Sequence, residues 1–231
     1  MSWVMFDFGG VIGKYQPEED VAALAAAAGV SVAQFRDAYW APRFAYDISA
    51  LTVTAFWQDV AGRLGRSFTD TQVGELLRLD IASWMHLCDG TVRLIHDLES
   101  AGRRLALLSN QPAENARAIA EIPLARHFEH LFFSCDLKAG KPDPGCFSQA
   151  LDRLGAAAEE VILIDDNEEN VRVATRMGMQ TIRFTGPEQA RAGLAGILGM
   201  DRLLSLLAPT GPGWMLAEQK LSVRSQTCWR V

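Results

Sequence analysis

The chain has 231 residues, of which 49% are hydrophobic and 22% are charged, values that are typical of a globular protein and exclude the fibrous and disordered classes. Its net charge of −6 provides no basic surface for nucleic acid or an anionic membrane, so a phosphorylated ligand would depend on local positive charge. The four cysteines have no metal-type spacing, and no segment has the length of a membrane span or the form of a secretory signal, so we expect a cytoplasmic protein with reduced thiols.

The first predicted element is the strand Trp3–Phe6, which leads directly into Asp7. An ionised carboxylate at the end of a buried strand is costly unless something nearby compensates its charge. Gly9 and Gly10 follow, and glycines allow a ligand to approach the backbone closely. Asp7 is therefore either a nucleophile presented by a parallel sheet or a turn residue that caps the next segment.

Residues 14–85 separate this strand from the next part of the alternating pattern, and they are predicted to be helical throughout. The alanine-rich segment 21–28 favours a helix that ends at Gly29, and the pairs Ser31 with Gln34 and Thr69 with Gln72 have capping-box form. We predict that 14–85 is a small helical cap. An insertion after the first strand would stand over the carboxyl edge of the sheet, where open α/β folds bind ligands.

Beyond residue 86, short apolar runs alternate with helical patterns, which is typical of βαβ units. The strands are expected at 104–108, His130–Phe133, 161–164 and 181–184, and the helices at about 91–100, 113–120, 144–154, 170–177 and 187–198. The predicted fold is therefore α/β, with a Rossmann-like parallel sheet flanked by helices. Residues 1–13 and 86–200 would form this core, and 201–231 would be a C-terminal extension, either a peripheral arm or a partner-binding strand.

Polar side chains follow several of the predicted strands: Asp7 after the first, Ser109 and Asn110 after the second, Asp165 and Asp166 after the fourth, and Lys141 in the loop after the third. Because the carboxyl ends of parallel strands lie at one edge, we expect these residues to converge in a single pocket. The convergence favours a functional site over isolated turn residues.

This set of residues points to phosphoryl chemistry. Three carboxylates would repel one another unless a divalent cation lay among them, and oxygen ligands favour Mg²⁺ over zinc. A phosphate could then bind the metal, Lys141, the Ser109 hydroxyl and backbone N–H groups of the turn from Phe8 to Gly10. Asp7 could attack phosphorus and form an aspartyl phosphate that water hydrolyses.

The motifs that contain these residues are Asp7-Phe8-Gly9-Gly10-Val11, Leu107-Leu108-Ser109-Asn110, Gly140-Lys141-Pro142-Asp143-Pro144 and Ile164-Asp165-Asp166-Asn167. Their order resembles the four motifs of the haloacid dehalogenase superfamily, over about residues 1–200. The insert is similar to the small helical cap of subfamily IA. Tyr46-Asp47 and Ala55-Phe56-Trp57 resemble the branch that includes bacterial α-glucose-1-phosphate phosphatases and the N-terminal phosphatase domain of epoxide hydrolases.

The resemblance implies that Asp7 is the nucleophile and a metal ligand, with the Gly9 carbonyl and Asp165 as further ligands and Asp166 bound directly or through water. It also implies that Ser109 binds a phosphate oxygen and that Lys141 balances charge. Asn110 and Asn170 would support the site without taking part in the chemistry. The expected activity is Mg²⁺-dependent hydrolysis of a small phosphorylated metabolite.

One position departs from the family pattern. Family phosphatases usually carry a second aspartate two residues after the nucleophile as acid and base, and this chain has Gly9 there. General acid–base catalysis is typically worth about 10² to 10⁴ in rate. The substrate could have a leaving oxygen that needs little help, as in an anomeric sugar phosphate, an acyl phosphate or an aryl phosphate. Alternatively, Tyr15 or Asp47 of the insert could supply the proton, or the protein could be a weak relative that binds a phospho-ligand or a partner.

A metal-free haloacid dehalogenase is a further alternative, which the pair of Asp165 and Asp166 disfavours, because extra carboxylates would repel a carboxylate substrate. The four histidines (His86, His96, His127 and His130) have no metal spacing and are expected in helices or loops. In the insert, Arg43, Phe44, Tyr46 and Trp57 could line the pocket, although the aromatic ones more often form core. The sequence leaves the oligomeric state open, and a monomer is compatible with it.

Overall fold

Five parallel strands form the central sheet of the protein, which the computed structural model describes from residue 2 to residue 199. They are β1 (Trp3–Phe6), β2 (Arg104–Ser109), β3 (His130–Phe133), β4 (Val161–Asp165) and β5 (Gln180–Arg183). The order across the sheet is β3-β2-β1-β4-β5, and all four pairings are parallel. The chain therefore continues to one side of β1 first and to the other side later, and this change of direction creates a switch point beside β1.

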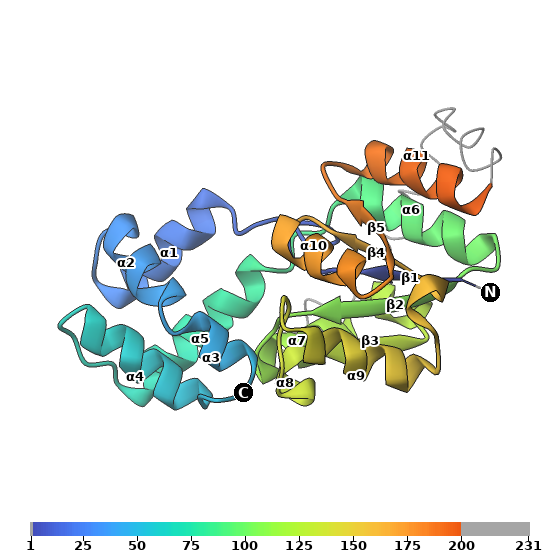
Figure 1. Cartoon of the computed structure of the whole chain (residues 1–231). Coiled ribbons are helices and arrows are strands. Elements are labelled where there is room, and N and C mark those ends of the chain that lie inside the picture. The colour runs from blue at the N-terminus through green and yellow to red at the C-terminus, as the bar shows by residue number, and fades with distance from the viewer. Residues whose placement is uncertain (1, 200–231) are drawn as a thin grey trace.

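Helices cover both faces of the sheet (Figure 1). One face packs against α6 (Asp89–Ser100), α7 (Ala113–Glu121), η1 (Pro123–His127) and α11 (Pro187–Leu198). The other face packs against α9 (Pro144–Leu154) and α10 (Glu168–Arg176), while α8 (Ser134–Leu137) and η2 (Ala158–Glu160) are short connecting helices. Residues of β1 divide between the faces with the two-residue period of a strand, since Val4 and Phe6 join the first core and Trp3 and Met5 the second. The predicted α/β fold is confirmed.

Five helices lie between β1 and α6 and have a hydrophobic core of their own. They are α1 (Glu18–Ala28), α2 (Val32–Trp40), α3 (Arg43–Asp47), α4 (Val53–Arg63) and α5 (Asp70–Ser83). Aromatic side chains dominate the centre, where Phe35, Tyr39, Phe56 and Trp57 contact one another. Figure 1 shows this helical cap at one end of the sheet, as predicted. The domain boundaries at residues 14 and 85 stay a prediction.

Local sequence signals account for where several cap helices begin and end. The side chains of Ser31 and Thr69 each accept a hydrogen bond from the backbone of the third helical residue, and Gln34 and Gln72 complete the two capping boxes. Helix α1 ends at Gly29, whose φ of 72° is left-handed and therefore favours glycine.

No helix within residues 2–199 is long and apolar enough to cross a membrane. The predicted C-terminal extension, 201–231, lies outside the described residues.

Candidate active site

The loop after β1 places Asp7 at the carboxyl edge of the sheet. The backbone N–H of Asp7 donates to the Ile164 carbonyl at 2.9 Å, which continues the pairing of β1 with β4 by one residue. The loop then turns tightly, with the N–H groups of Ile12 and Gly13 both donating to the Phe8 carbonyl. Gly10 has a φ of 76°, and a Cβ there would clash with the Asp166 carboxylate, so the turn requires glycine at this position.

Two backbone donors predicted for phosphate already have partners. The Phe8 N–H donates to Oδ1 of Asp7 at 2.6 Å, and the Gly10 N–H donates to the Gly13 carbonyl at 2.7 Å. The Phe8 side chain is buried in the core. Gly9 lines the cavity described below, and a Cβ there would meet its nearest neighbour, the Trp84 ring, at 3.6 Å. Gly9 is therefore a position with room for a side chain.

Lys141 links the ends of two strands. Its Nζ lies 2.9 Å from Oδ1 of Asp7 and 2.6 Å from Oδ2 of Asp165, and the side chain is buried. The loop that carries Lys141 is held by Asn110, whose amide bonds the backbone N–H and carbonyl of Lys141, each at 2.8 Å. Ser109 ends β2 and is buried beside them at the cavity wall. Residues from four separate segments therefore converge as predicted.

Asp165 and Asp166 are adjacent in sequence but have different surroundings. Asp165 is fully buried, and both of its carboxylate oxygens have partners in Lys141, the Asn170 amide and the Asn167 backbone N–H. Asp166 lines the cavity and accepts a hydrogen bond from the Tyr15 hydroxyl. Only Asp166 of this pair therefore presents its carboxylate to a ligand.

The charges of this cluster perturb one another. The pKa of Asp7 is raised to about 7, and burial of the carboxyl group is the largest cause. Lys141 acts to lower this pKa, whereas Asp165 and Asp166 act to raise it further. Burial also acts to lower the pKa of Lys141, but Asp165 and Asp7 outweigh it and hold that pKa above its ordinary value. One ammonium thus faces three carboxyl groups, so the cluster is short of positive charge.

The donor atoms of this cluster fit a hard divalent cation. One carboxylate oxygen from each of Asp7, Asp165 and Asp166 lies within 4.8 Å of the others. Carboxylate and carbonyl oxygens are the ligands that Mg²⁺ prefers, and a cation there would offset the excess of negative charge.

A cavity of about 220 Å³ opens above these groups and extends under the cap. Its core side includes Asp7, Gly9, Ser109, Asn110, Lys141 and Asp166. Its cap side is formed by Tyr15, Trp40, Arg43, Asp47 and Trp84. The volume is below that of typical pockets for drug-sized molecules, so the space suits a small ligand.

The cap side of the cavity carries a buried ionic network around Arg43. Its Nε donates to Asp47 at 2.7 Å, and its Nη1 lies 3.4 Å from the Asp80 carboxylate and also bonds the Tyr39 hydroxyl. Burial raises the pKa of Asp47 and of Asp80, although Arg43 acts to lower both. Arg43 lines the cavity, which is a position that the sequence allowed for it.

The three aromatic candidates do not line the cavity. Tyr46 and Trp57 belong to the hydrophobic core of the cap, as aromatic residues in a small helical domain usually do. Phe44 is half exposed and would contact a Cβ at Gly140.

Four cavity residues were given no role from the sequence: Trp40, Trp84, Gln111 and Asn167. Gln111 is buried, and its Oε1 has no hydrogen-bond partner among the described residues, while its Nε2 lies 3.5 Å from the Ser109 hydroxyl. Its position two residues after Ser109 at a strand end was the available signal. The two tryptophans lie near cap helix ends, where nothing in the sequence distinguishes a lining residue from a core residue.

Comparison with known proteins adds a family and several relatives. Residues 1–178 match the family model "Hydrolase: haloacid dehalogenase-like hydrolase". The chain is 25% identical over 125 residues to a phosphorylated carbohydrates phosphatase of Thermotoga maritima, a match that covers 51% of this chain and 58% of the relative. It is 34% identical over 94 residues to (S)-2-haloacid dehalogenase 4A of Burkholderia cepacia, covering 39% of each. It is 29% identical over 102 residues to bifunctional epoxide hydrolase 2 of Sus scrofa, covering 44% of this chain and 18% of the relative.

These matches span less than two thirds of the length of each of these relatives. Among solved structures, an enzyme of this family from Bacteroides thetaiotaomicron, in complex with magnesium and inorganic phosphate, superposes with a TM-score of 0.63. It is 19% identical, and the match covers 79% of this chain and 93% of that one. At that identity the likeness shows the shared fold alone.

Proposed function

The chain belongs to the haloacid dehalogenase-like hydrolases, and we propose that it is a Mg²⁺-dependent phosphatase for a small phosphorylated metabolite. The observation that carries this proposal is the buried bridge of Lys141 between Asp7 and Asp165, next to the cavity-facing carboxylate of Asp166. This arrangement combines a candidate nucleophile, a fixed positive charge and a set of metal ligands within one small cavity. The carbohydrate phosphatase relative supports the same activity.

In the proposed reaction, Asp7 attacks phosphorus, the ester oxygen leaves, and water later hydrolyses the aspartyl phosphate. Lys141 remains charged beside Asp7 and would stabilise the negative phosphoryl oxygens. Ser109 would donate its hydroxyl to one of these oxygens. Asn110 holds the backbone of Lys141 at both hydrogen-bonding groups, which supports a role in positioning rather than chemistry.

Asp7, Asp166 and the Gly9 carbonyl are the groups that we propose to hold Mg²⁺ directly. A bound magnesium ion would neutralise the substrate phosphate and the carboxylates around it. Asp165 was predicted as a direct ligand as well, but its oxygens already bond Lys141, Asn167 and Asn170, so we propose that it chiefly orients Lys141. A direct bond from Asp165 to the metal stays a prediction.

The proton for the leaving group is proposed to come from Asp47 when the substrate needs one. Asp47 and Tyr15 both line the cavity, but the Tyr15 hydroxyl already donates to Asp166. Asp47 is held by Arg43, and burial raises the pKa of Asp47, which favours its protonated form. A good leaving group, such as that of a sugar 1-phosphate, would make this proton less important.

A catalytically weak phospho-ligand-binding protein is the second candidate, favoured by the glycine at position 9. The similarity to (S)-2-haloacid dehalogenase 4A of Burkholderia cepacia favours a third candidate, a haloacid dehalogenase. The carboxylate of Asp166 in the cavity disfavours it, because it would repel a haloacid.

The deciding experiment is phosphate release from a substrate panel that contains sugar 1-phosphates and p-nitrophenyl phosphate, with Mg²⁺ and with EDTA. We expect turnover that requires Mg²⁺ and disappears in Asp7→Asn. Thermal stabilisation by panel compounds without any phosphate release would support the binding protein. Chloride release from 2-chloropropionate without Mg²⁺ would support the dehalogenase, and either result would overturn the phosphatase.

A further inference from the structure

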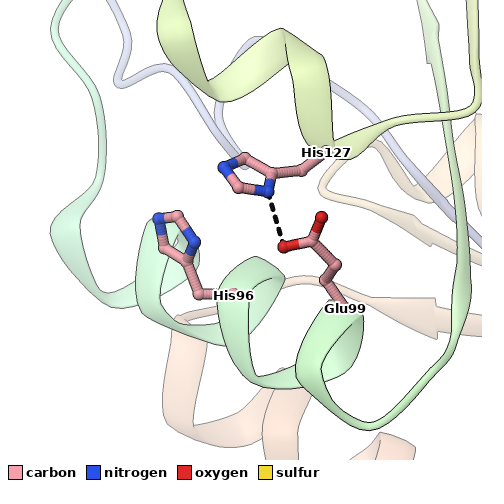
Figure 2. Close-up of side chains that lie close together, drawn as sticks. All are labelled: His96, Glu99 and His127. Carbon is pink, nitrogen blue, oxygen red and sulfur yellow. Dashed lines mark hydrogen bonds and ion pairs between the residues drawn. The ribbon is translucent and has the colours of Figure 1, made fainter.

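A second cluster of metal-ligating side chains lies outside the catalytic cavity. Figure 2 shows His96, Glu99 and His127 pointing toward a common space, and one ligand atom from each lies within 4.8 Å of the others. Nδ1 of His127 is 2.6 Å from Oε2 of Glu99, and the two imidazole rings are 4.5 Å apart and nearly perpendicular, at 80°. The two rings therefore meet edge to face, which is a common arrangement for neighbouring aromatic rings.

Two helices that are separated in the sequence, α6 and η1, bring these three residues together. His96 and Glu99 are three residues apart on α6, so both side chains project from one face of the helix. His127 is the last residue of η1, which packs on α6 through Leu124 in the same hydrophobic core. The next residue, Phe128, packs edge to face against Phe6 of β1. The third side chain is therefore anchored rather than carried by a free loop.

We propose that His96, Glu99 and His127 form a binding site for a divalent cation of the zinc class. Two imidazoles and one carboxylate are a donor set that Zn²⁺ uses in sites with three protein ligands and an open fourth position. The set differs from the all-oxygen cluster around Asp7, which suits Mg²⁺. Zn²⁺ would lie between Nδ1 of His127 and the Glu99 carboxylate in place of the hydrogen-bonding proton, and the neutral imidazole would then carry its proton on Nε2.

The electrostatics of α6 also favour a cation at this position. Glu99 lies in the last turn of the helix, where the partial negative charge of the helix end disfavours a carboxylate. No basic residue occupies that turn. The His127 side chain is 10% exposed and the Glu99 side chain is 48% exposed, so the cluster is fixed on one side and open to solvent on the other.

A matched pair elsewhere shows what distinguishes the cluster. His86 and Asp20 are also 2.6 Å apart, but within residues 2–199 no third ligand group completes a set around them. That pair is a simple surface contact between a histidine and a carboxylate. His86 is therefore the natural control for a metal site at His96 and His127.

The proposed site is remote from the catalytic cavity. Helix α6 ends at Ser100 and leads into β2, and η1 ends at His127 and leads into β3, so the cluster lies toward the amino edge of the sheet. The cavity lies at the carboxyl edge. Zn²⁺ bound here would join α6 to η1 and stabilise the folded state without contacting the substrate. This inference does not depend on the proposed phosphatase activity.

The test follows the four imidazoles of the untagged full chain by NMR during titration with ZnCl₂, with Mg²⁺ in excess to occupy the oxygen cluster. We expect the His96 and His127 resonances, assigned by single substitutions, to shift together with one-site behaviour, while those of His86 and His130 stay in place. Shifts of all four histidines, or of none, would overturn the proposal.

Calorimetry and melting provide a second, independent measurement. His96→Ala and Glu99→Gln should each weaken Zn²⁺ binding at least about tenfold, since loss of a group behind a metal ligand already costs about 10 to 100-fold. They should also remove the Zn²⁺-dependent rise in Tm, whereas His86→Ala should keep both. Melting in EDTA verifies that each variant is folded. Equal Zn²⁺ affinity in the wild type and the His96→Ala protein would refute the site.

Discussion

At the scale of single residues, adjacent positions in this chain have different constraints. Gly9 and Gly10 are neighbours, yet only Gly10 combines a left-handed φ with a neighbouring carboxylate that excludes a side chain. Asp165 and Asp166 are neighbours, yet one is enclosed by hydrogen bonds and the other faces the cavity. Sequence motifs identify such pairs, but only the structure separates the two members.

Substitution of the two glycines should therefore give opposite results. Gly10→Ala should abolish activity, because its Cβ would displace Asp166, while Gly9→Ala should be tolerated, because its Cβ would lie at contact distance from Trp84.

Gly9→Asp should raise kcat for phosphate esters with poor leaving groups by up to about 10²-fold and change p-nitrophenyl phosphate turnover little. Steady-state kinetics on both substrate types would measure this. Equal gains for both would show that the aspartate does not act as an acid.

Gln111 gives a second prediction at this scale. Its buried Oε1 lacks a partner among the described residues, so a substrate hydroxyl bonded there would raise affinity by about 1 kcal/mol. Gln111→Leu should raise KM about fivefold to tenfold without lowering Tm. Asn110→Leu is the contrasting variant, because it breaks two hydrogen bonds to Lys141 and should lower both Tm and kcat. An unchanged KM in Gln111→Leu for every substrate would exclude the contact.

At the scale of elements, the cap is held to the core by a few polar contacts. The Tyr46 hydroxyl of α3 donates to Glu114 of α7 at 2.7 Å, and the Ser134 hydroxyl of α8 donates to the Asp47 carbonyl at 2.6 Å. Because Asp47 and Arg43 both belong to α3, these contacts also fix the cap side of the cavity. The position of the cap and the cap-side wall of the cavity are therefore coupled through the short helix α3.

Tyr46→Phe should loosen this coupling. Loss of one hydrogen bond worth about 1 kcal/mol would raise the open fraction of the cap about fivefold. Hydrogen exchange of α3 amides should accelerate, while that of α9 should not. Thr69→Ala is the matched control, since it removes the α5 cap at a similar cost of about 1 kcal/mol without touching the contact between cap and core. Equal exchange changes in both variants would point to general destabilisation.

The sequence predicted most elements because apolar runs and caps are local signals. All five strands were expected within a residue of their observed bounds, and both capping boxes are present. The helices α8, η1 and η2 were missed because three to five residues are too few for a helical period to appear. Cap-side lining residues were missed for a different reason, since Trp40 and Trp84 reach the cavity only through the packing of helices.

At the scale of the whole molecule, we expect Mg²⁺ binding to raise the free energy of unfolding and therefore the Tm of the protein. At a concentration of about 100 times Kd, Mg²⁺ adds about 2.7 kcal/mol, or roughly 5 to 10 °C in Tm for a chain of this size. Asp7→Asn and Asp166→Asn should lose most of this increment. Asp165→Asn should instead lower the Tm of the metal-free protein, because Lys141 loses a buried partner, at a cost of about 3 kcal/mol or more.

Melting curves with Mg²⁺ and with EDTA separate these outcomes. If Asp165→Asn lost the Mg²⁺-dependent increment in Tm and Asp166→Asn kept it, Asp165 rather than Asp166 would be the metal ligand, contrary to the proposal. The increment in Tm should be smaller with Ca²⁺ than with Mg²⁺, because the longer bonds and larger coordination number of Ca²⁺ fit this compact cluster of carboxylates less well.

The central position of β1 has a consequence for synthesis of the chain on the ribosome. Its two partners are β2, which begins at Arg104, and β4, which begins at Val161, so the apolar strand that leads to Asp7 emerges long before either of them. At about 5 to 20 residues per second, β1 would wait several seconds for its neighbours while the cap helices, with their local contacts, could already form. Asp7, the proposed nucleophile, would therefore be made before the other candidate site residues and would be among the last to reach its final surroundings.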